Sequence, residues 1–178
     1  MNPTRIFIAT ISIFFGTQIQ AAEIGTDMAK AANALLASLN AQQRTKAAFT
    51  FKGGERTYWH FIPAEMLKGG NRKGLQIKEM TAPQRKLTQT LLKSVLSEGG
   101  HAKVNKIMFL EDILFMLEGK GRRFVRDSDA YHVLIFGKPD NKGAWGWRFE
   151  GHHLSFNYTI VNGKLRSVPS FWGSNPAV

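Results

Sequence analysis

The sequence contains no cysteine. Thiol catalysis, iron–sulfur clusters and cysteine zinc sites are therefore excluded, because each needs a thiolate. Disulfides are excluded too, although small exported domains often depend on them. The fold must consequently be stabilised by the packing of its side chains.

The chain also lacks an apolar run that spans a bilayer comfortably, since a transmembrane helix needs roughly 20 apolar residues. The longest largely apolar run is Ile6–Gly16, which follows Arg5 and precedes small residues at Ala21 and Ala22. That order is typical of a secretory signal peptide, with an uncleaved anchor as the alternative. We predict a signal peptide over residues 1–22 and a single exported domain, periplasmic or secreted, over residues 23–178.

Acidic residues are few beside the basic ones: 13 Asp and Glu against 24 Lys and Arg, a formal net charge of +11. This excess favours anionic partners such as lipid headgroups or acidic envelope polymers, whereas nucleic acid is not expected for an exported chain. The basic residues are densest in two glycine-rich segments, 68–74 and 119–126, which are predicted to be loops. A non-catalytic envelope protein that binds an anionic polymer is therefore one hypothesis.

Apolar residues at helical spacing predict helices over residues 26–51, 81–98 and 101–118. The Gly99–Gly100 pair is expected to end the second of these helices. The third helix is expected to bury one broad apolar face, made of Val104, Ile107, Met108, Ile113, Leu114 and Leu117.

Two short segments, "NAQQR" and "TAPQR", carry the same helix-start pattern. Asn40 and Thr81 are suited to cap a helix, and Gln43 and Gln84 follow three residues later, which predicts a capping box in each case. Asn40 is thus expected to interrupt the first helical region and to begin a new helix. Five residues establish no internal repeat, so both segments are interpreted as solutions to the same capping problem.

Strand patterns dominate from residue 129 onward. Alternating and apolar residues predict strands over 130–137, 145–161 and 164–168, the last ended by Pro169. Asn162 and Gly163 predict a two-residue hairpin turn. The fold class is therefore α+β, with N-terminal helices followed by an antiparallel sheet that contains this hairpin.

The segment "WGWRFEGHHLSFNYTI", residues 145–160, changes its pattern halfway. Apolar residues occupy the odd positions before Gly151 and the even positions after it. Because strand side chains alternate between faces, a regular strand would transfer its apolar side chains to the other face at this point. We predict a β-bulge at Gly151–His152 that restores the alternation. One face then carries the polar residues Arg148, Glu150, His153, Ser155 and Asn157.

This polar face is the candidate site, and one interpretation of it is a metal centre. His152 and His153 are expected to approach one divalent metal ion, with Glu150 as an oxygen ligand. A further ligand could come from His60, His101 or His132.

Two other interpretations stay open. Glu150 and His153 could act as general acid and base, while Arg148 binds an anionic substrate. Alternatively, Arg148 and Glu150 form a structural cross-strand pair and the histidines bind backbone groups.

The sequence also resembles the DUF3500 family of functionally uncharacterised, often exported proteins. The resemblance is carried by "WHFIP", "RKGLQIKEMTAPQRKLTQTLLKSVLSEGG", "MFLEDIL", "YHVLIFGKPDNKGAWGWRFEGHHLSFNYTIVNG" and "SFWGSNPA", and it covers roughly residues 30–177. "WGWRFEGHHLS" is its most specific part. The resemblance implies that this chain corresponds to the N-terminal half of longer relatives.

We therefore expect an exported α+β protein whose ligand is unknown. If it is an enzyme, metal-assisted hydrolytic chemistry at the candidate site is the expected class. A partner chain is also expected under two hypotheses, a homodimer or a missing second half. The remaining alternative is a truncated relic without independent activity.

Overall fold

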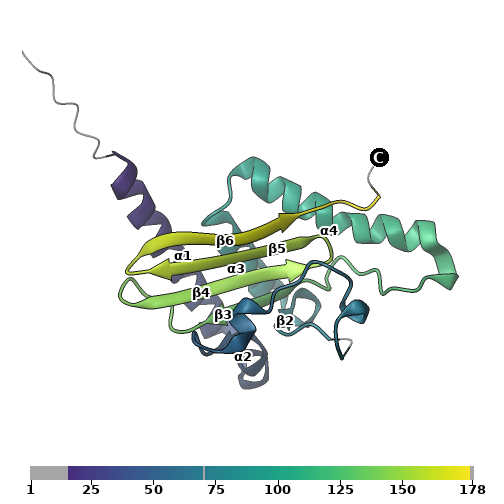
Figure 1. The fold of residues 1–178 in the computed structure, drawn as a ribbon, viewed down its shortest axis with the longest axis horizontal. Helices are drawn as coiled ribbons and strands as arrows, with labels where there is room; N and C mark the ends of the chain where they lie inside the picture. Colours follow the sequence, from purple (N-terminus) through teal and green to yellow (C-terminus); the bar gives the residue numbers. More distant parts are fainter. Residues whose placement is uncertain (1–15, 70, 177–178) are drawn as a thin grey trace, which may run out of the picture.

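The computed structural model describes residues 16–69 and 71–176, and it confirms the α+β class (Figure 1). The helices are α1 (Gly16–Ser38), α2 (Ala41–Ala47), α3 (Ala82–Lys93) and α4 (Glu98–Glu118). The strands are β1 (Ala48–Phe49), β2 (Leu75–Gln76), β3 (His132–Phe136), β4 (Ala144–Gly151), β5 (Leu154–Val161) and β6 (Lys164–Trp172). Short 3₁₀ turns are η1 (Gly54–Thr57), η2 (Ala64–Met66), η3 (Ile77–Glu79) and η4 (Gly119–Gly121).

The strands form one sheet in the order β1-β3-β4-β5-β6, and β2 also pairs with β3. All pairs are antiparallel except β1 with β3, so the sheet is mixed rather than purely antiparallel as predicted. A parallel pair needs a long crossover connection, and here α3 and α4 lie between β1 and β3 in the chain.

The predicted signal peptide lies mostly outside the described residues, because residues 1–15 are not among them. Helix α1 begins at Gly16, inside the predicted segment. None of the described helices is long and apolar enough to cross a membrane. Export of the chain therefore stays a prediction.

Both predicted capping boxes are present, but two helix ends differ from the prediction. Residues 48 and 49 form β1 rather than helix. Helix α3 ends at Lys93, well before the Gly99–Gly100 pair. These glycines instead lie in the first turn of α4, because the Ser97 hydroxyl accepts a hydrogen bond from the Gly100 N–H at 3.1 Å and caps that helix.

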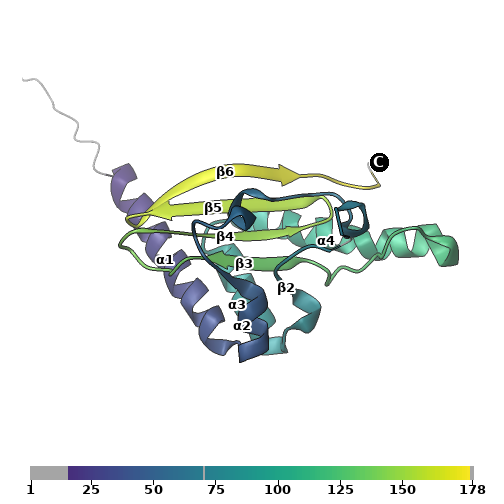
Figure 2. The same cartoon turned by 60° about the horizontal axis from the view of Figure 1, so that its bottom comes forward.

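The two capping boxes contact each other. Gln43 Nε2 donates to Gln84 Oε1 at 3.0 Å, and Gln84 Nε2 donates to Gln43 Oε1 at 2.9 Å. Gln84 also donates to the carbonyl of Ser38, where α1 ends. The similar segments thus hold the starts of α2 and α3 against the end of α1, below the sheet in Figure 2.

The predicted bulge at Gly151–His152 is wrong: β4 and β5 form a hairpin whose turn is His152–His153. Gly151 pairs with Leu154 and Glu150 with Ser155, so odd positions on β4 face even positions on β5. A two-residue turn therefore produces the same change of pattern as a bulge. His153 adopts φ 61°, and the Tyr131 ring packs so closely on Gly151 that a Cβ there would lie 2.4 Å from it.

The second predicted turn, Asn162–Gly163, is confirmed, with φ of 50° and 71°. Its return strand β6 continues past Pro169 to Trp172. Pro169 is tolerated because β6 is the edge strand and because the β5–β6 register shifts beside it.

The sheet has one apolar and one polar face, as the pattern predicted. The apolar face packs on α1, α3 and α4, and its central residues are Trp145, Trp147, Phe149, Leu154, Phe156 and Ile160. The other face carries Arg148, Glu150, Ser155 and Asn157, all buried. It is covered by residues 50–69 and 71–74, called here the covering loop, which crosses the front of the sheet in Figure 1.

We predict that the Gln43–Gln84 amide pair couples the two helix starts energetically. Each single change to Ala should lower the free energy of unfolding by about 1–3 kcal/mol, because it leaves the partner amide with unmet hydrogen bonds. In a double-mutant cycle read by urea denaturation, the coupling should be about 0.5–1.5 kcal/mol. Purely additive losses would contradict the pair.

Candidate functional site

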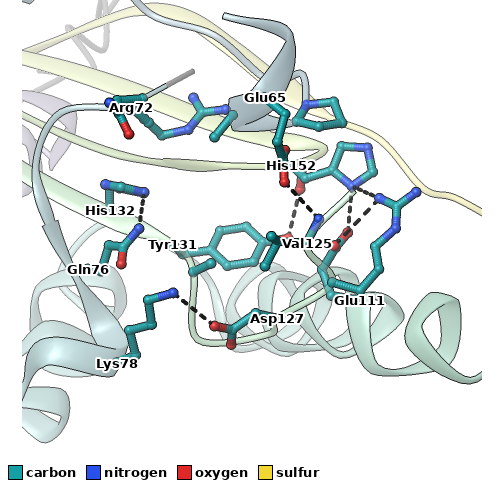
Figure 3. Close-up of a pocket in the computed structure, with 15 residues that line it drawn as sticks. Glu65, Arg72, Gln76, Lys78, Glu111, Val125, Asp127, Tyr131, His132 and His152 are labelled. Atoms are coloured by element: carbon teal, nitrogen blue, oxygen red, sulfur yellow. Dashed lines mark hydrogen bonds and ion pairs between the residues drawn. The ribbon is translucent and has the colours of Figure 1, made fainter. Parts of the chain in front are cut away.

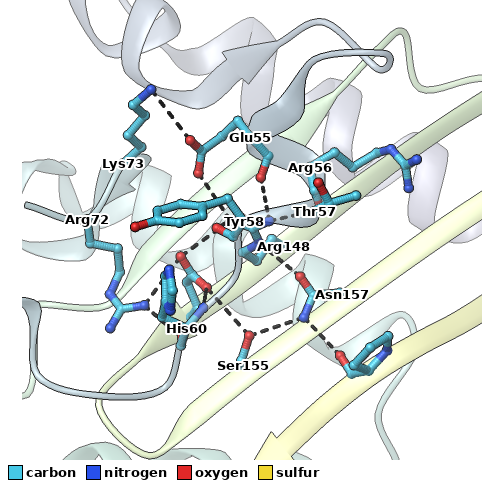
Figure 4. Close-up of polar contacts among 12 residues, drawn as sticks. Glu55, Arg56, Thr57, Tyr58, His60, Arg72, Lys73, Arg148, Ser155 and Asn157 are labelled. Carbon is cyan, nitrogen blue, oxygen red and sulfur yellow. Dashed lines mark hydrogen bonds and ion pairs between the residues drawn. The ribbon is translucent and has the colours of Figure 1, made fainter. Parts of the chain in front are cut away.

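Arg148 lies at the centre of the polar face and is fully buried (Figure 4). Its Nε donates to Asn157 Oδ1 at 2.8 Å. Its Nη atoms donate to the carbonyls of Glu55, Arg56 and Tyr58 at 2.7 to 3.0 Å. Every nitrogen of the guanidinium therefore bonds to the protein, and Arg148 fixes the covering loop to the sheet.

Glu150 balances this charge. Its carboxylate lies 3.4 Å from Arg148 Nη1 and 3.3 Å from Arg72 Nη1, and it accepts a hydrogen bond from the His60 backbone N–H at 3.0 Å. Glu55 adds a second carboxylate, 3.3 Å from Arg148 Nη1. In the interior, the two guanidiniums are thus balanced by two carboxylates, as a low-dielectric environment requires, and the exposed Lys73 approaches Glu55 from the solvent side at 3.5 Å. Burial lowers the pKa of Arg72, opposed by the attraction of Glu150.

His153 does not join this cluster. Its backbone N–H donates to the Phe61 carbonyl at 2.8 Å, and its carbonyl accepts from the Gly173 N–H at 2.8 Å. The buried Nδ1 of its ring has no hydrogen-bond partner among the described residues. Burial, assisted by the neighbouring His152, lowers the pKa of His153 to about 4, so the ring is neutral at physiological pH. The triad predicted from Arg148, Glu150 and His153 is therefore not assembled in this structure.

His152, the first residue of the turn, belongs to a different group of charges (Figure 3). Its Nδ1 lies 2.5 Å from Glu111 Oε1. Arg126 Nη1 lies 3.2 Å from the same nitrogen and 3.7 Å from Glu111 Oε2. Glu118 holds Arg126 from the other side through Nε and Nη2, at 2.9 and 2.5 Å. The His152 carbonyl accepts a hydrogen bond from the Tyr131 hydroxyl at 2.7 Å.

The geometry of this pair shows which nitrogen of the His152 ring faces the carboxylate. A carboxylate accepts only, so a hydrogen bond from His152 to Glu111 places the hydrogen on Nδ1, and Arg126 Nη1 then contacts this nitrogen without donating to it. No described residue hydrogen-bonds to Nε2, and this nitrogen is not among the buried unpartnered atoms. Nε2 is therefore available to a ligand.

His152 and Glu111 line a pocket of about 250 Å³ between the hairpin tip, the covering loop and α4. Its wall also contains Glu65, Arg72, Gln76, Lys78, Arg126, Asp127, Tyr131 and His132, most of them labelled in Figure 3. The volume is just below the roughly 300–1,000 Å³ that is usual for ligand pockets. Such a pocket suits a small polar ligand.

The predicted metal centre receives no support from this arrangement. His152 and His153 have ring centroids 3.9 Å apart, but Glu150 is bound to Arg72 and Arg148 in the other cluster. Within residues 16–69 and 71–176, no group of three or more His, Asp or Glu side chains is placed to hold a metal ion.

The other histidines considered as ligands do not join His152 and His153 in a ligand group, although His132 lines the same pocket. His101 contacts Gln89 on α3. His132 is buried beside Gln76, and burial lowers its pKa to about 4. His60 lies against the edge of the Tyr58 ring.

Three residues that contact His152 were not predicted from the sequence: Glu111, Arg126 and Tyr131. Glu111 is not among the candidate residues from the sequence, and its side chain is buried. The signal was available, because Glu111 continues the helical spacing of Val104, Ile107 and Met108 on the buried side of α4. A carboxylate on the buried side of a helix indicates that a hydrogen-bonding or cationic side chain lies next to it in the core.

The comparisons with known proteins identify a family but no activity. The model of the DUF3500 family, described as "Protein of unknown function (DUF3500)", matches residues 21–178. The predicted family is thereby confirmed, and the match covers nearly the whole chain. No curated protein and no solved structure matches.

We predict that Arg148→Lys destabilises the fold. A lysine retains the charge but cannot reach the acceptors that the guanidinium binds, so the free energy of unfolding should fall by about 3–5 kcal/mol. Arg166→Lys on the exposed edge strand is the matched control and should change it by less than about 0.5 kcal/mol. Equal effects in urea denaturation would refute the anchoring role of Arg148.

A second prediction concerns the loss of folding stability at acidic pH. His153 has a pKa of about 4 in the folded protein and about 6.5 when unfolded, so below pH 6.5 the unfolded state binds more protons. Stability should be full above that pH and decline as the pH falls from about 6.5 to 4. His153→Asn tolerates the positive φ and should reduce the decline. The urea concentration at the midpoint of unfolding, measured for both proteins from about pH 8 to pH 4, tests this prediction. At about pH 8 both histidine states are neutral, so the difference between the proteins there gives the effect of the substitution itself on stability.

Proposed function

Since the chain belongs to the DUF3500 family, which is described only as of unknown function, we propose a function from the geometry of its pocket. The pocket at the β4–β5 turn is an active site in which His152 acts as general base, oriented by Glu111. The reaction class is hydrolysis of a small polar ester or a related acyl compound. The observation that carries this proposal is the 2.5 Å contact between His152 Nδ1 and Glu111 in the wall of the pocket, while no described residue hydrogen-bonds to Nε2.

Glu111 supports the proposed role in two ways. It fixes the tautomer of His152, and its negative charge stabilises the imidazolium that forms when Nε2 takes a proton. The carboxylate itself is rigidly placed, because it is buried on α4 beside Met108 and Leu114. Arg126 partly balances Glu111, so the pair is not an isolated buried charge.

The proposed reaction needs a water molecule and a carbonyl substrate. Nε2 of His152 takes a proton from the water, whose oxygen forms a bond to the carbonyl carbon. The imidazolium then returns the proton to the leaving oxygen as the carbon–oxygen bond breaks. The pocket wall carries three cations, Arg72, Arg126 and Lys78, each paired with a carboxylate, and their N–H groups are the candidate donors to the carbonyl oxygen of the substrate.

Two further parts of the proposal rest on the sequence. We propose that the protein acts outside the cytoplasm, supported by the signal-peptide pattern over residues 1–22. The predicted divalent metal has no part in the proposed step, because the described residues that line the pocket provide no ligand cluster.

The test is hydrolysis of chromogenic esters by the purified protein, with p-nitrophenyl acetate and p-nitrophenyl hydrogen succinate as probes. His152→Gln should lower kcat by about 10²–10⁴-fold, the usual contribution of a general base. Glu111→Gln should lower kcat less and alter the pH dependence of the rate, because the neutral amide no longer stabilises the imidazolium.

His101→Gln is the matched control, since this histidine contacts Gln89 and lines no part of the pocket. It should retain wild-type kcat. Thermal unfolding of all three variants shows whether the fold is retained. Activity in a folded His152→Gln variant equal to wild type, or no hydrolysis of either probe by the wild type, would overturn the proposal.

A further inference from the structure

Helix α4 is apolar on two sides, and the sheet covers only one of them. Its inner side buries Val104, Ile107, Met108, Glu111 and Leu114. Its outer side exposes Phe109 by 56%, Met116 by 69% and Leu117 by 68%. The predicted burial of Leu117 is therefore wrong, because the helix has a second apolar face.

These exposed residues form a stripe along the helix. Phe109 and Met116 are seven residues apart and therefore lie on the same face of an α-helix, with the half-buried Ile113 between them. Leu117 widens the stripe at its C-terminal end. The second half of α4 extends past the end of the sheet, so the described residues leave this face uncovered (Figures 1 and 2). We call Phe109, Ile113, Met116 and Leu117 the outer stripe.

Basic side chains flank the outer stripe at both ends. Lys103 and Lys106 precede it, and Lys120, Arg122 and Arg123 follow it, all exposed. The Arg122 guanidinium lies over the ring of Phe115, which is outside the outer stripe, at 4.1 Å from the ring centroid.

The acidic side chains nearby are fewer. Glu118 is paired with Arg126, and Asp112 is half-buried beside the stripe. The flanks are therefore positive, in keeping with the whole chain's formal charge of +11.

We propose that the outer stripe binds the surface of an anionic lipid bilayer. An apolar face between basic flanks is the pattern of helices that lie in the interface, where apolar side chains enter the acyl boundary and cations meet the headgroups. Such a helix does not span the bilayer, in keeping with the absence of a membrane-crossing helix among the described residues. The charges disfavour a second copy as the occupant. Antiparallel pairing centred on Ile113 would place Lys106 of one copy opposite Lys120 of the other.

The test is co-sedimentation of the protein with vesicles of phosphatidylglycerol and phosphatidylcholine in equal parts, against vesicles of phosphatidylcholine alone. The wild type should bind the anionic vesicles, more weakly at high salt, and should not bind the neutral ones. Phe109→Ser with Met116→Ser should weaken binding about tenfold or more, because these side chains no longer enter the apolar layer. Both positions are exposed, so the melting temperature should stay near that of the wild type.

Matched controls distinguish binding through the outer stripe from attraction of the whole positively charged protein to anionic vesicles. Met66→Ser removes a methionine that is 55% exposed outside α4, and it should bind as the wild type does, whereas Met116→Ser should bind more weakly. Arg122→Gln with Arg123→Gln should weaken binding by about fivefold per charge, since each cation near the surface contributes about 1 kcal/mol. Lys142→Gln with Lys164→Gln removes the same charge at the opposite end of the sheet and should have little effect.

Three results would overturn the proposal. The first is no sedimentation of the wild type with anionic vesicles. The second is an equal loss in both charge-reduced pairs, which would show attraction by net charge alone. The third is a dimer in sedimentation equilibrium that Phe109→Ser with Met116→Ser dissociates, which would assign the outer stripe to a second copy of the chain.

Discussion

Arg148 places a full positive charge inside the protein, where an ion is stable only if acceptors and opposite charges surround it. The sheet supplies Glu150 and Asn157, and the covering loop supplies carbonyls and Glu55. This requirement holds a long segment with little regular structure in one place on the sheet. The same segment reaches the β4–β5 turn, where the Phe61 carbonyl accepts the His153 N–H, and its Glu65 lines the pocket. The position of this part of the pocket wall thus depends on Arg148, although Arg148 does not line the pocket.

Much of the fold follows from local pattern. The capping boxes at Asn40 and Thr81 were predictable because they involve residues three apart, and the Asn162–Gly163 turn because few residues favour positive φ. The partition of the sheet into an apolar and a polar face was predictable because strand side chains alternate. The assignment of Arg148, Glu150, Ser155 and Asn157 to one face is therefore confirmed, whereas His153 lies in the turn, and the burial of that face was not predicted.

The site was less predictable, because the same change of pattern has two physical solutions. A bulge would have kept His153 on the polar face with Arg148, whereas a two-residue turn moves both histidines to the tip of the hairpin. Only the pairing of Gly151 with Leu154 distinguishes them, and pairing is a long-range property. The partners of His152 come from α4 and the segment after it, 41 and 26 residues away. Local sequence patterns do not predict such long-range contacts. The position of Glu111 on the buried side of α4 did indicate that its carboxylate has a partner elsewhere in the chain.

Helix α4 contributes to both proposals through opposite faces: its inner face carries Glu111 of the proposed active site, and its outer face carries the outer stripe. Its inner face must be rigid, because Glu111 orients His152 only if Val104, Ile107 and Met108 hold the helix against the core. Its outer face contributes little to that packing, since Phe109 and Met116 are mostly exposed. Substitutions on the outer face should therefore leave the Glu111–His152 contact unchanged, and substitutions in the pocket should leave the outer stripe unchanged. The two proposals consequently fail or stand separately, and a variant that affects both would indicate a change in the position of α4 itself.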